Sequence, residues 1–121
     1  MNAAMNLFFV AAAALIVALG AAHSYLGERL ILVKLFRDHT VPAILGSPRF
    51  TMRTLRFTWH LTTVMMWSSA AILLVADRTV ALVLAWTYLI CAVVAAAGSR
   101  FRHFSWGVFL LCAALVWWGA R

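Results

Sequence analysis

Four long stretches without a charged residue constrain this chain more than any other feature of its sequence. They cover residues 1–27, 57–76, 79–99 and 103–120. An α-helix needs about 17–25 apolar residues to cross a hydrocarbon core about 30 Å thick, and each stretch is long enough. Because lipid offers no hydrogen-bond partner to a bare backbone, we expect each stretch to be helical. The stretches also lack the apolar and polar alternation of a membrane barrel strand.

The overall composition excludes an ordinary soluble domain. The 121 residues are 66% hydrophobic and 11% charged, whereas a soluble domain carries about 25% charged residues. So few polar side chains cannot cover the aqueous surface of a chain of this size. A disordered tail, a disulfide-stapled secreted module and an ordinary globular enzyme are therefore excluded as classes.

We predict one all-α transmembrane domain over residues 1–121, an up-down four-helix bundle. Its helices are expected over about 4–36, 50–76, 79–99 and 103–120. The first helix would run past the membrane boundary as a basic amphipathic extension. Asp77 and Arg78 would form the turn between the second and third helices, and Gly98 would stop the third helix.

The positions of lysine and arginine predict the orientation. Two basic residues, Arg78 and Arg121, lie on the side of the second connection and the C-terminus. Eight lie on the side of the first and third connections: Arg29, Lys34, Arg37, Arg49, Arg53, Arg56, Arg100 and Arg102. Because positive charge is retained in the cytoplasm, both termini should lie on the non-cytoplasmic side of a bacterial inner membrane.

The same charged residues indicate which partners the chain can have. The net charge of +7 follows the membrane topology, so nucleic acid is not an expected partner. The bilayer is the expected partner, with Arg49, Arg53, Arg56, Arg100 and Arg102 at lipid head groups. A second copy of the chain or another membrane protein is a further candidate, because small residues on the first and third helices would allow close packing.

The N-terminal segment has an alternative interpretation. Met1–Ala22 could be a signal peptide, with Gly20, Ala21 and Ala22 as a small-residue cleavage site. The basic region that normally precedes such a peptide is missing, so we expect a membrane span instead. Cys91 and Cys112 lie in predicted spans without C-x-x-C spacing, and we expect them to be packing residues.

Ionisable residues inside a span are the candidate functional residues. Each costs about 2.5–3.5 kcal/mol on insertion scales, so each is a site hypothesis by default. The first helix carries His23 and Glu28, about 140° apart around its axis, with Ser24 and Gly27 between them. A neighbouring helix packed on those small residues could contact both ionisable groups. The alternative is purely structural, with His23 bonded to a neighbour and Glu28 paired with an arginine of the second helix, Arg53 or Arg56.

The second helix shows a polar stripe at helical spacing. Its members recur at steps of four and three residues and therefore share one face: Arg49, Arg53, Arg56, His60, Thr63 and Trp67. The stripe indicates either a site that includes His60 or an interfacial anchor with Trp59 in the aromatic belt. His103 opens the fourth helix among aromatic and basic residues, which favours another belt. His39, in the first connection, is expected to be solvated.

Taken together, His23, Glu28, His60 and His103 are a tentative metal-ligand set. Imidazole and carboxylate groups suit copper, zinc or iron, and a pair of histidines suits haem. The same residues could relay protons, because histidine titrates near neutral pH. The sequence leaves the cofactor open. It has no glycine-rich phosphate loop, no G-x-S-x-G motif and three acidic residues, so an enzyme is not expected.

Two segments carry a resemblance to known proteins. They are His23–Arg29, with the sequence HSYLGER, and Arg56–Thr62, with the sequence RFTWHLT. The chain resembles small bacterial four-helix inner-membrane proteins of unknown function, a likeness that implies no site. It is also similar in length and helix number to small multidrug resistance transporters, which use a glutamate of the first helix. Here Glu28 lies late in the helix beside Arg29, and residues 79–99 lack that family's glycine-rich dimer motif.

Three functions follow as hypotheses. The first is an accessory or structural membrane protein without chemistry of its own. The second is a protein with a His and Glu site on the cytoplasmic half that binds a metal or haem or relays protons. The third is a small dimeric transporter coupled to cations or protons.

Overall fold

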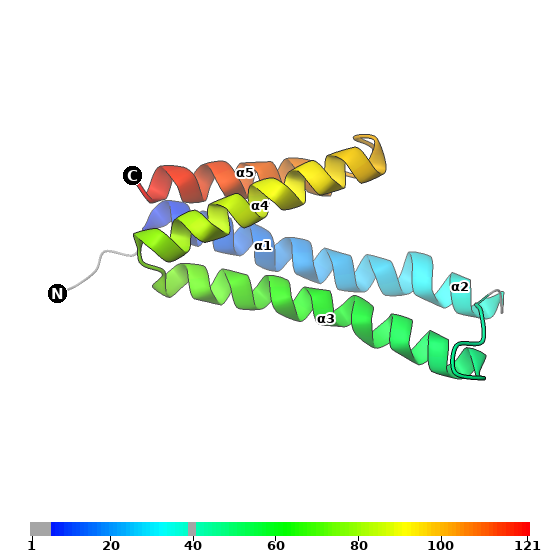
Figure 1. Cartoon of the computed structure of the whole chain (residues 1–121). Helices are drawn as coiled ribbons and strands as arrows, with labels where there is room; N and C mark the ends of the chain where they lie inside the picture. Colours follow the sequence, from blue (N-terminus) through cyan, green and yellow to red (C-terminus); the bar gives the residue numbers. More distant parts are fainter. Residues whose placement is uncertain (1–5, 39–40) are drawn as a thin grey trace. The chain divides into compact units, whose positions relative to one another are not determined.

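The structure is a computed structural model that describes residues 6–38 and 41–121. Within these residues it is all-α, as predicted, and contains no β-strand. The helical segments are Leu7–Arg37, Pro48–Val75, Arg78–Ser99 and Ser105–Gly119 (Figure 1). His39 and residues 1–5, where the alternative signal peptide would begin, lie outside the described residues.

Three of these segments are long and apolar enough to cross a membrane: Leu7–Arg37, Pro48–Val75 and Arg78–Ser99. The fourth segment, α5 (Ser105–Gly119), has 15 residues. At a rise of 1.5 Å per residue its length is about 22 Å, which is shorter than a hydrocarbon core. Three of the four expected helices thus have the length and apolar composition that a membrane span requires.

The first segment changes its helical geometry along its length. It consists of α1 (Leu7–Leu26), the π-helix η1 (Gly27–Leu32) and α2 (Val33–Arg37). After the π-helix, the Val33 N–H donates to the carbonyl oxygen of Glu28, five residues earlier. The sequence did not predict this π-helix, which surrounds the candidate residue Glu28. Such wide turns are frequent at functional sites.

The connections between the later helices are short. α3 (Pro48–Val75) is followed by Ala76 and Asp77, and the Asp77 carboxylate caps α4 (Arg78–Ser99) by accepting from Val80 N–H at 2.8 Å. The expected stop at Gly98 is wrong, because Gly98 lies inside α4. The left-handed residues are Arg100 (φ 51°) and Phe101 (φ 62°). Phe101 N–H donates to the Ala96 carbonyl oxygen and Arg100 N–H to the Ala97 carbonyl oxygen. These hydrogen bonds end the helix without a glycine.

The chain divides into two compact units. The hairpin unit is Gly20–Met65, and the apolar unit is Met1–Leu19 together with Met66–Arg121. The core of the apolar unit consists of small and branched apolar side chains from its four helical stretches. The most buried are Ala12, Ile16, Leu73, Ala81, Cys112 and Val116.

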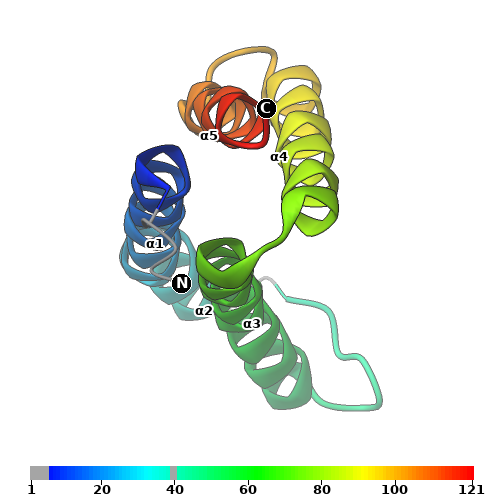
Figure 2. The ribbon, with the colours of Figure 1, turned by 90° about the vertical axis from the view of Figure 1, so that its left-hand side faces the viewer.

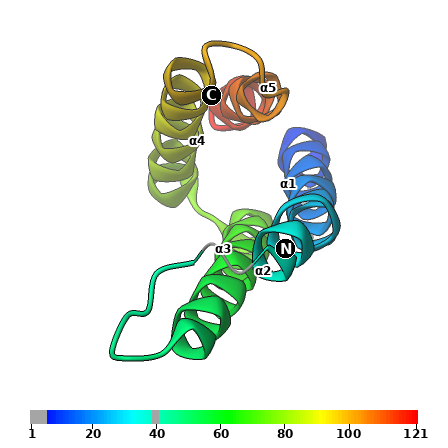
Figure 3. The same cartoon turned by 90° about the vertical axis from the view of Figure 1, so that its right-hand side faces the viewer.

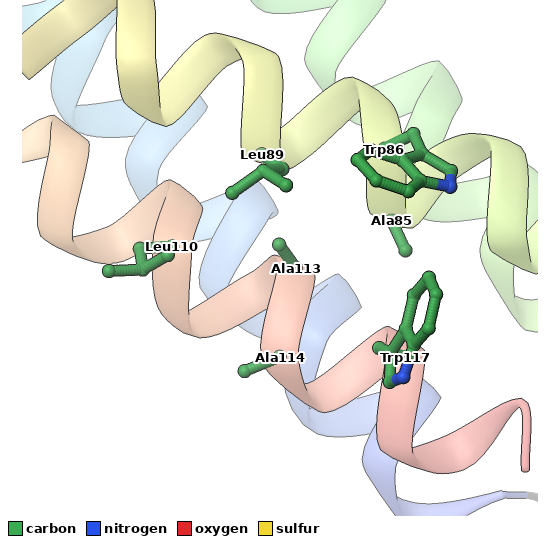
Figure 4. A pocket seen from close by; sticks show the side chains of 7 residues that line it. All are labelled: Ala85, Trp86, Leu89, Leu110, Ala113, Ala114 and Trp117. Atoms are coloured by element: carbon green, nitrogen blue, oxygen red, sulfur yellow. The ribbon is translucent and has the colours of Figure 1, made fainter.

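Within the apolar unit, α4 and α5 pack along each other (Figure 2). An apolar hollow of about 200 Å³ lies between them, with Ala85, Ala113 and Ala114 among its lining residues (Figure 4). Trp86 and Trp117 lie edge to face beside it, with ring centroids 5.9 Å apart. Alanine side chains thus let these two helices approach, and the tryptophans fill the outer part of the contact.

In the hairpin unit, the described part of the first connection is fastened to the start of α3. Thr51, which is 4% exposed, accepts a hydrogen bond from Ile44 N–H at 3.1 Å and donates one to the Pro42 carbonyl oxygen at 2.7 Å. Figure 3 shows this connection running into α3. The single hydroxyl therefore fixes where residues 42–44 lie against the helix.

Candidate functional site

The end of α1 and the middle of α3 pack antiparallel in the hairpin unit. Thr63 Oγ1 donates to the Gly20 carbonyl oxygen at 3.4 Å, and Trp59 Nε1 donates to the His23 carbonyl oxygen at 3.0 Å. One turn further along, Arg56 reaches Glu28. Between Arg56 and Thr63, the polar stripe of α3 thus faces the small-residue face formed by the end of α1 and the start of η1.

Glu28 is the acceptor at the centre of these contacts. Its Oε1 lies 2.9 Å from Arg56 Nη2, and its Oε2 lies 3.2 Å from Arg56 Nε. Two N–H groups of one guanidinium therefore bind both carboxylate oxygens, the geometry that gives arginine–carboxylate pairs their directionality. Arg56 also lies over the Phe36 ring, 5.0 Å from its centroid. These contacts fix the Glu28 carboxylate in place.

His60 bridges this carboxylate to a hydroxyl group. Its Nε2 lies 3.3 Å from Glu28 Oε2, and its Nδ1 lies 2.5 Å from Ser24 Oγ. A carboxylate only accepts hydrogen bonds, so Nε2 must donate to Glu28. In the neutral imidazole the lone pair is then on Nδ1 and accepts the Ser24 hydroxyl proton. The result is a continuous chain from Ser24 through His60 and Glu28 to Arg56.

His23 lies beside this chain and has its own partners. Its ring stacks on the Trp59 indole with an interplanar angle of 1° and a centroid separation of 4.7 Å. Its Nε2 lies 2.9 Å from Thr62 Oγ1, and the Thr62 hydroxyl donates to the Trp59 carbonyl oxygen at 2.7 Å. Because that hydroxyl has one proton, Thr62 accepts from His23, and Nε2 of His23 is the donor.

Gly27 allows Trp59 to occupy this position. A Cβ atom at residue 27 would overlap the Trp59 indole, including its Nε1 atom. The indole therefore lies directly on the backbone of η1, where any larger side chain would displace it. Gly27 and Trp59 together set the distance between the two helices at the polar site.

The site is open on one side. The exposed fractions of the side chains are 29% for Glu28, 39% for His60 and 49% for Arg56. Exposed neighbours in the sequence are both apolar, namely Leu26, Phe57 and Leu61, and polar, namely Tyr25, Arg29 and Arg53.

The structure brings together only some of the predicted site residues. Glu28 and His60 are in direct contact, and His23 lies in the same unit with separate partners. His103 belongs to the apolar unit, where its Nδ1 lies 2.7 Å from Ser105 Oγ and its ring stacks on Phe104. Within residues 6–38 and 41–121, no group of three or more His, Cys, Asp or Glu side chains could hold a metal ion. The metal-ligand set therefore stays a prediction from sequence.

The five arginines predicted at lipid head groups fall into two kinds, one that belongs to the site and four that are exposed. Arg56 binds Glu28, so its guanidinium belongs to the site, although about half of the side chain is exposed. The other four side chains are exposed: Arg49, Arg53, Arg100 and Arg102. Between the two sequence alternatives for Glu28, the structure selects Arg56, which is one turn from His60 on the same face of α3.

Two residues of the site were not recognised from the sequence. Ser24 was interpreted as a small packing residue and Trp59 as part of an aromatic belt, but Ser24 contacts His60 and Trp59 contacts His23. A signal was present for both, because Ser24 and Gly27 lie between His23 and Glu28 on one helical face. Pairing that face antiparallel with the α3 stripe would have placed both residues.

Comparisons of the chain with protein-family models, curated proteins and solved structures give no significant match.

Proposed function

We propose that the chain is a small multi-pass protein of the bacterial inner membrane that relays protons through Ser24, His60 and Glu28. The observation that carries this proposal is the pair of contacts made by His60, whose two ring nitrogens face a hydroxyl group and a carboxylate. Histidine can accept a proton on one nitrogen and release one from the other, and it does so near neutral pH.

The proposed topology has four crossings, with both termini on the non-cytoplasmic side. The eight lysines and arginines on one side against two on the other support this orientation. α5 is about 22 Å long, and Arg102 and Arg121 beyond its ends can extend their side chains to the head groups. The polar site then lies toward the cytoplasmic end of the hydrocarbon core, where it can exchange protons with water.

We propose that lipid surrounds the site. Arg49, Arg53, Arg100 and Arg102 have exposed side chains and would bind anionic head groups of the cytoplasmic leaflet. Arg56 has a second role, because it holds the Glu28 carboxylate against His60. A charged carboxylate within reach of a paired guanidinium is less costly at the membrane boundary than an isolated one.

Proton flux through the reconstituted protein tests the proposal. The purified chain would be placed in liposomes that contain a pH-sensitive dye, and a potassium diffusion potential would drive protons inward. We expect acidification faster than in empty liposomes, and we expect His60→Gln to reduce it to the empty-liposome rate. His103→Gln is the matched control, because it makes the same change outside the polar chain and should leave the flux intact.

The same measurement separates this proposal from the two other functions. Wild-type flux equal to that of empty liposomes would reject a proton relay and leave the contacts with the structural role of an accessory protein. Flux that persists in Glu28→Gln would exclude both a relay through that carboxylate and a transporter that depends on it.

A further inference from the structure

Along their hydrogen bonds, Ser24, His60 and Glu28 follow one another as a nucleophile, a base and an acidic residue that orients the base would. We propose that Ser24 is a nucleophile activated by His60, and that it accepts an acyl group from a lipid ester. Nucleophilic serine requires a base within hydrogen-bond reach and a third group that holds the base. The Ser24–His60 and His60–Glu28 contacts supply both at 2.5 Å and 3.3 Å.

The Glu28–Arg56 pair determines which nitrogen of His60 acts as the base. Arg56 binds both carboxylate oxygens, so Glu28 is held as an acceptor toward His60 Nε2. The Nδ1 lone pair is consequently aimed at the Ser24 hydroxyl, and the imidazolium formed after proton transfer faces the Glu28 charge. Arg56 is thus a positioning residue for the base.

The surroundings of the site indicate the substrate class. His60 and Glu28 are partly exposed, and several of their exposed neighbours in the sequence are apolar: Leu26, Phe57 and Leu61. In the proposed membrane setting, a lipid can lie against these side chains. An ester of a long-chain acyl group fits this position, since its chain can lie against the apolar side chains while its carbonyl group reaches the polar chain.

The proposed reaction is an acyl transfer. Ser24 Oγ forms a bond to the carbonyl carbon of the ester as its proton moves to His60 Nδ1. The bond from the carbonyl carbon to the alcohol oxygen breaks, and His60 returns the proton to the departing alcohol. Water then attacks the acyl-serine with His60 again as the base, which releases the carboxylic acid and restores the Ser24 hydroxyl.

An alkyl fluorophosphonate probe tests the nucleophile directly. Reaction with Ser24 would form an oxygen–phosphorus bond, expel fluoride and transfer the hydroxyl proton to His60. We expect mass spectrometry of the full chain in detergent to locate the adduct on Ser24. His60→Gln should lower the labelling rate about 100-fold or more, in line with the contribution of a general base.

The chain contains its own control for a serine that merely lies beside a histidine. Ser105 Oγ is 2.7 Å from His103 Nδ1, yet within the described residues neither side chain contacts a carboxylate. Ser105 should therefore stay unlabelled under conditions that label Ser24. Equal labelling of Ser24 and Ser105 would overturn the proposal, because it would show simple exposure rather than activation.

Two further results would also overturn it. One is an absence of any Ser24 adduct in wild-type protein whose helical content is intact by circular dichroism. The other is labelling of Ser24 that His60→Gln leaves unchanged. Ser24→Ala should abolish the adduct while retaining the helix, since alanine favours helical backbone. Proton flux is read separately, so loss of the relay and loss of the nucleophile are distinguishable.

Discussion

The two units of this chain hold their helices together in different ways. In the apolar unit, buried alanine, leucine and isoleucine side chains fill the contacts between helices. In the hairpin unit, the end of α1 and the start of η1 are joined to the middle of α3 by hydrogen bonds and an ion pair around Glu28 and His60. In the proposed membrane setting, burial gains little from the hydrophobic effect, so the apolar unit would depend on close packing and the hairpin unit on polar contacts.

This difference predicts that substitutions in the apolar unit mainly change the stability of the protein, whereas substitutions in the hairpin unit mainly change the state of His60. Loss of a buried side chain in the apolar unit should reduce the free energy of unfolding without changing which ring nitrogen of His60 carries the proton. Loss of a polar group in the hairpin unit should alter the hydrogen bonds and tautomer of His60 more than it alters stability. Four experiments, ordered from the largest expected effect on stability to the smallest, can break or sharpen this contrast.

The largest effect is expected for Leu73→Ala in the apolar unit. Leu73 is 0% exposed, so truncation leaves a cavity, and buried leucine-to-alanine changes cost about 2–5 kcal/mol. Unfolding titrations in mixed micelles would measure the loss. Leu74→Ala is the matched control, because Leu74 is 48% exposed and should change stability by less than about 0.5 kcal/mol. Equal losses for the two variants would contradict the assigned core.

Gly27→Ala should be the most disruptive small change in the hairpin unit. Its Cβ would overlap Trp59, and overpacking costs about 1–3 kcal/mol. Gly98→Ala is the control, because nothing lies within 4 Å of its added Cβ and alanine favours the helix. Thermal unfolding followed by circular dichroism should thus show a lower midpoint for Gly27→Ala and an equal or higher one for Gly98→Ala. The reverse order would reject close packing of Trp59 on η1.

Glu28→Gln should affect stability by less than the two packing changes. The groups involved are 29–49% exposed, and exposed ion pairs contribute about 0–1 kcal/mol. Its main effect should be on His60, which loses the charged acceptor at Nε2. Nitrogen chemical shifts of the labelled imidazole should show a change in tautomer for His60 and none for His103. Unchanged His60 shifts would show that Glu28 does not orient this ring.

The smallest effect is expected for the polar contact between α3 and α4. Ser69 donates to the Met66 carbonyl oxygen, so it accepts from the Tyr88 hydroxyl at 3.0 Å. Interhelical hydrogen bonds in membranes contribute about 0.6 kcal/mol on average. A double-mutant cycle with Ser69→Ala and Tyr88→Phe should give a coupling energy near this value. A coupling above about 2 kcal/mol would show that polar contacts also dominate in the apolar unit.

The sequence was sufficient for the helices because lipid-length apolar stretches leave few alternatives. It was also sufficient to identify His60 and Glu28 as candidates, since ionisable groups in such stretches are rare. It could not show which histidine joins Glu28, because that depends on the antiparallel register of two consecutive helical segments. His23 and His60 both lie on suitable faces, and only the pairing of Ser24 with His60 separates them.

Other features depend on contacts that no local pattern encodes. Arg100 and Phe101 take left-handed conformations although Gly98 was the expected stop, because the last turn of α4 closes without needing a glycine. Trp59 has the composition of a belt residue, and only the space above Gly27 places it inside the helix pair.

The π-helix η1 has a consequence for how this sequence can change in length. A π-turn contains one residue more than the α-turn it replaces. Removing one residue from 27–32 would let an ordinary α-helix form there. The side chains after the deletion would then keep their present direction around the axis relative to those of α1. Glu28, however, would lose the wide turn in which it lies. Deletions in η1 should therefore be tolerated by the backbone and still disconnect Glu28 from His60, whereas deletions elsewhere in α1 should rotate one half of the helix against the other.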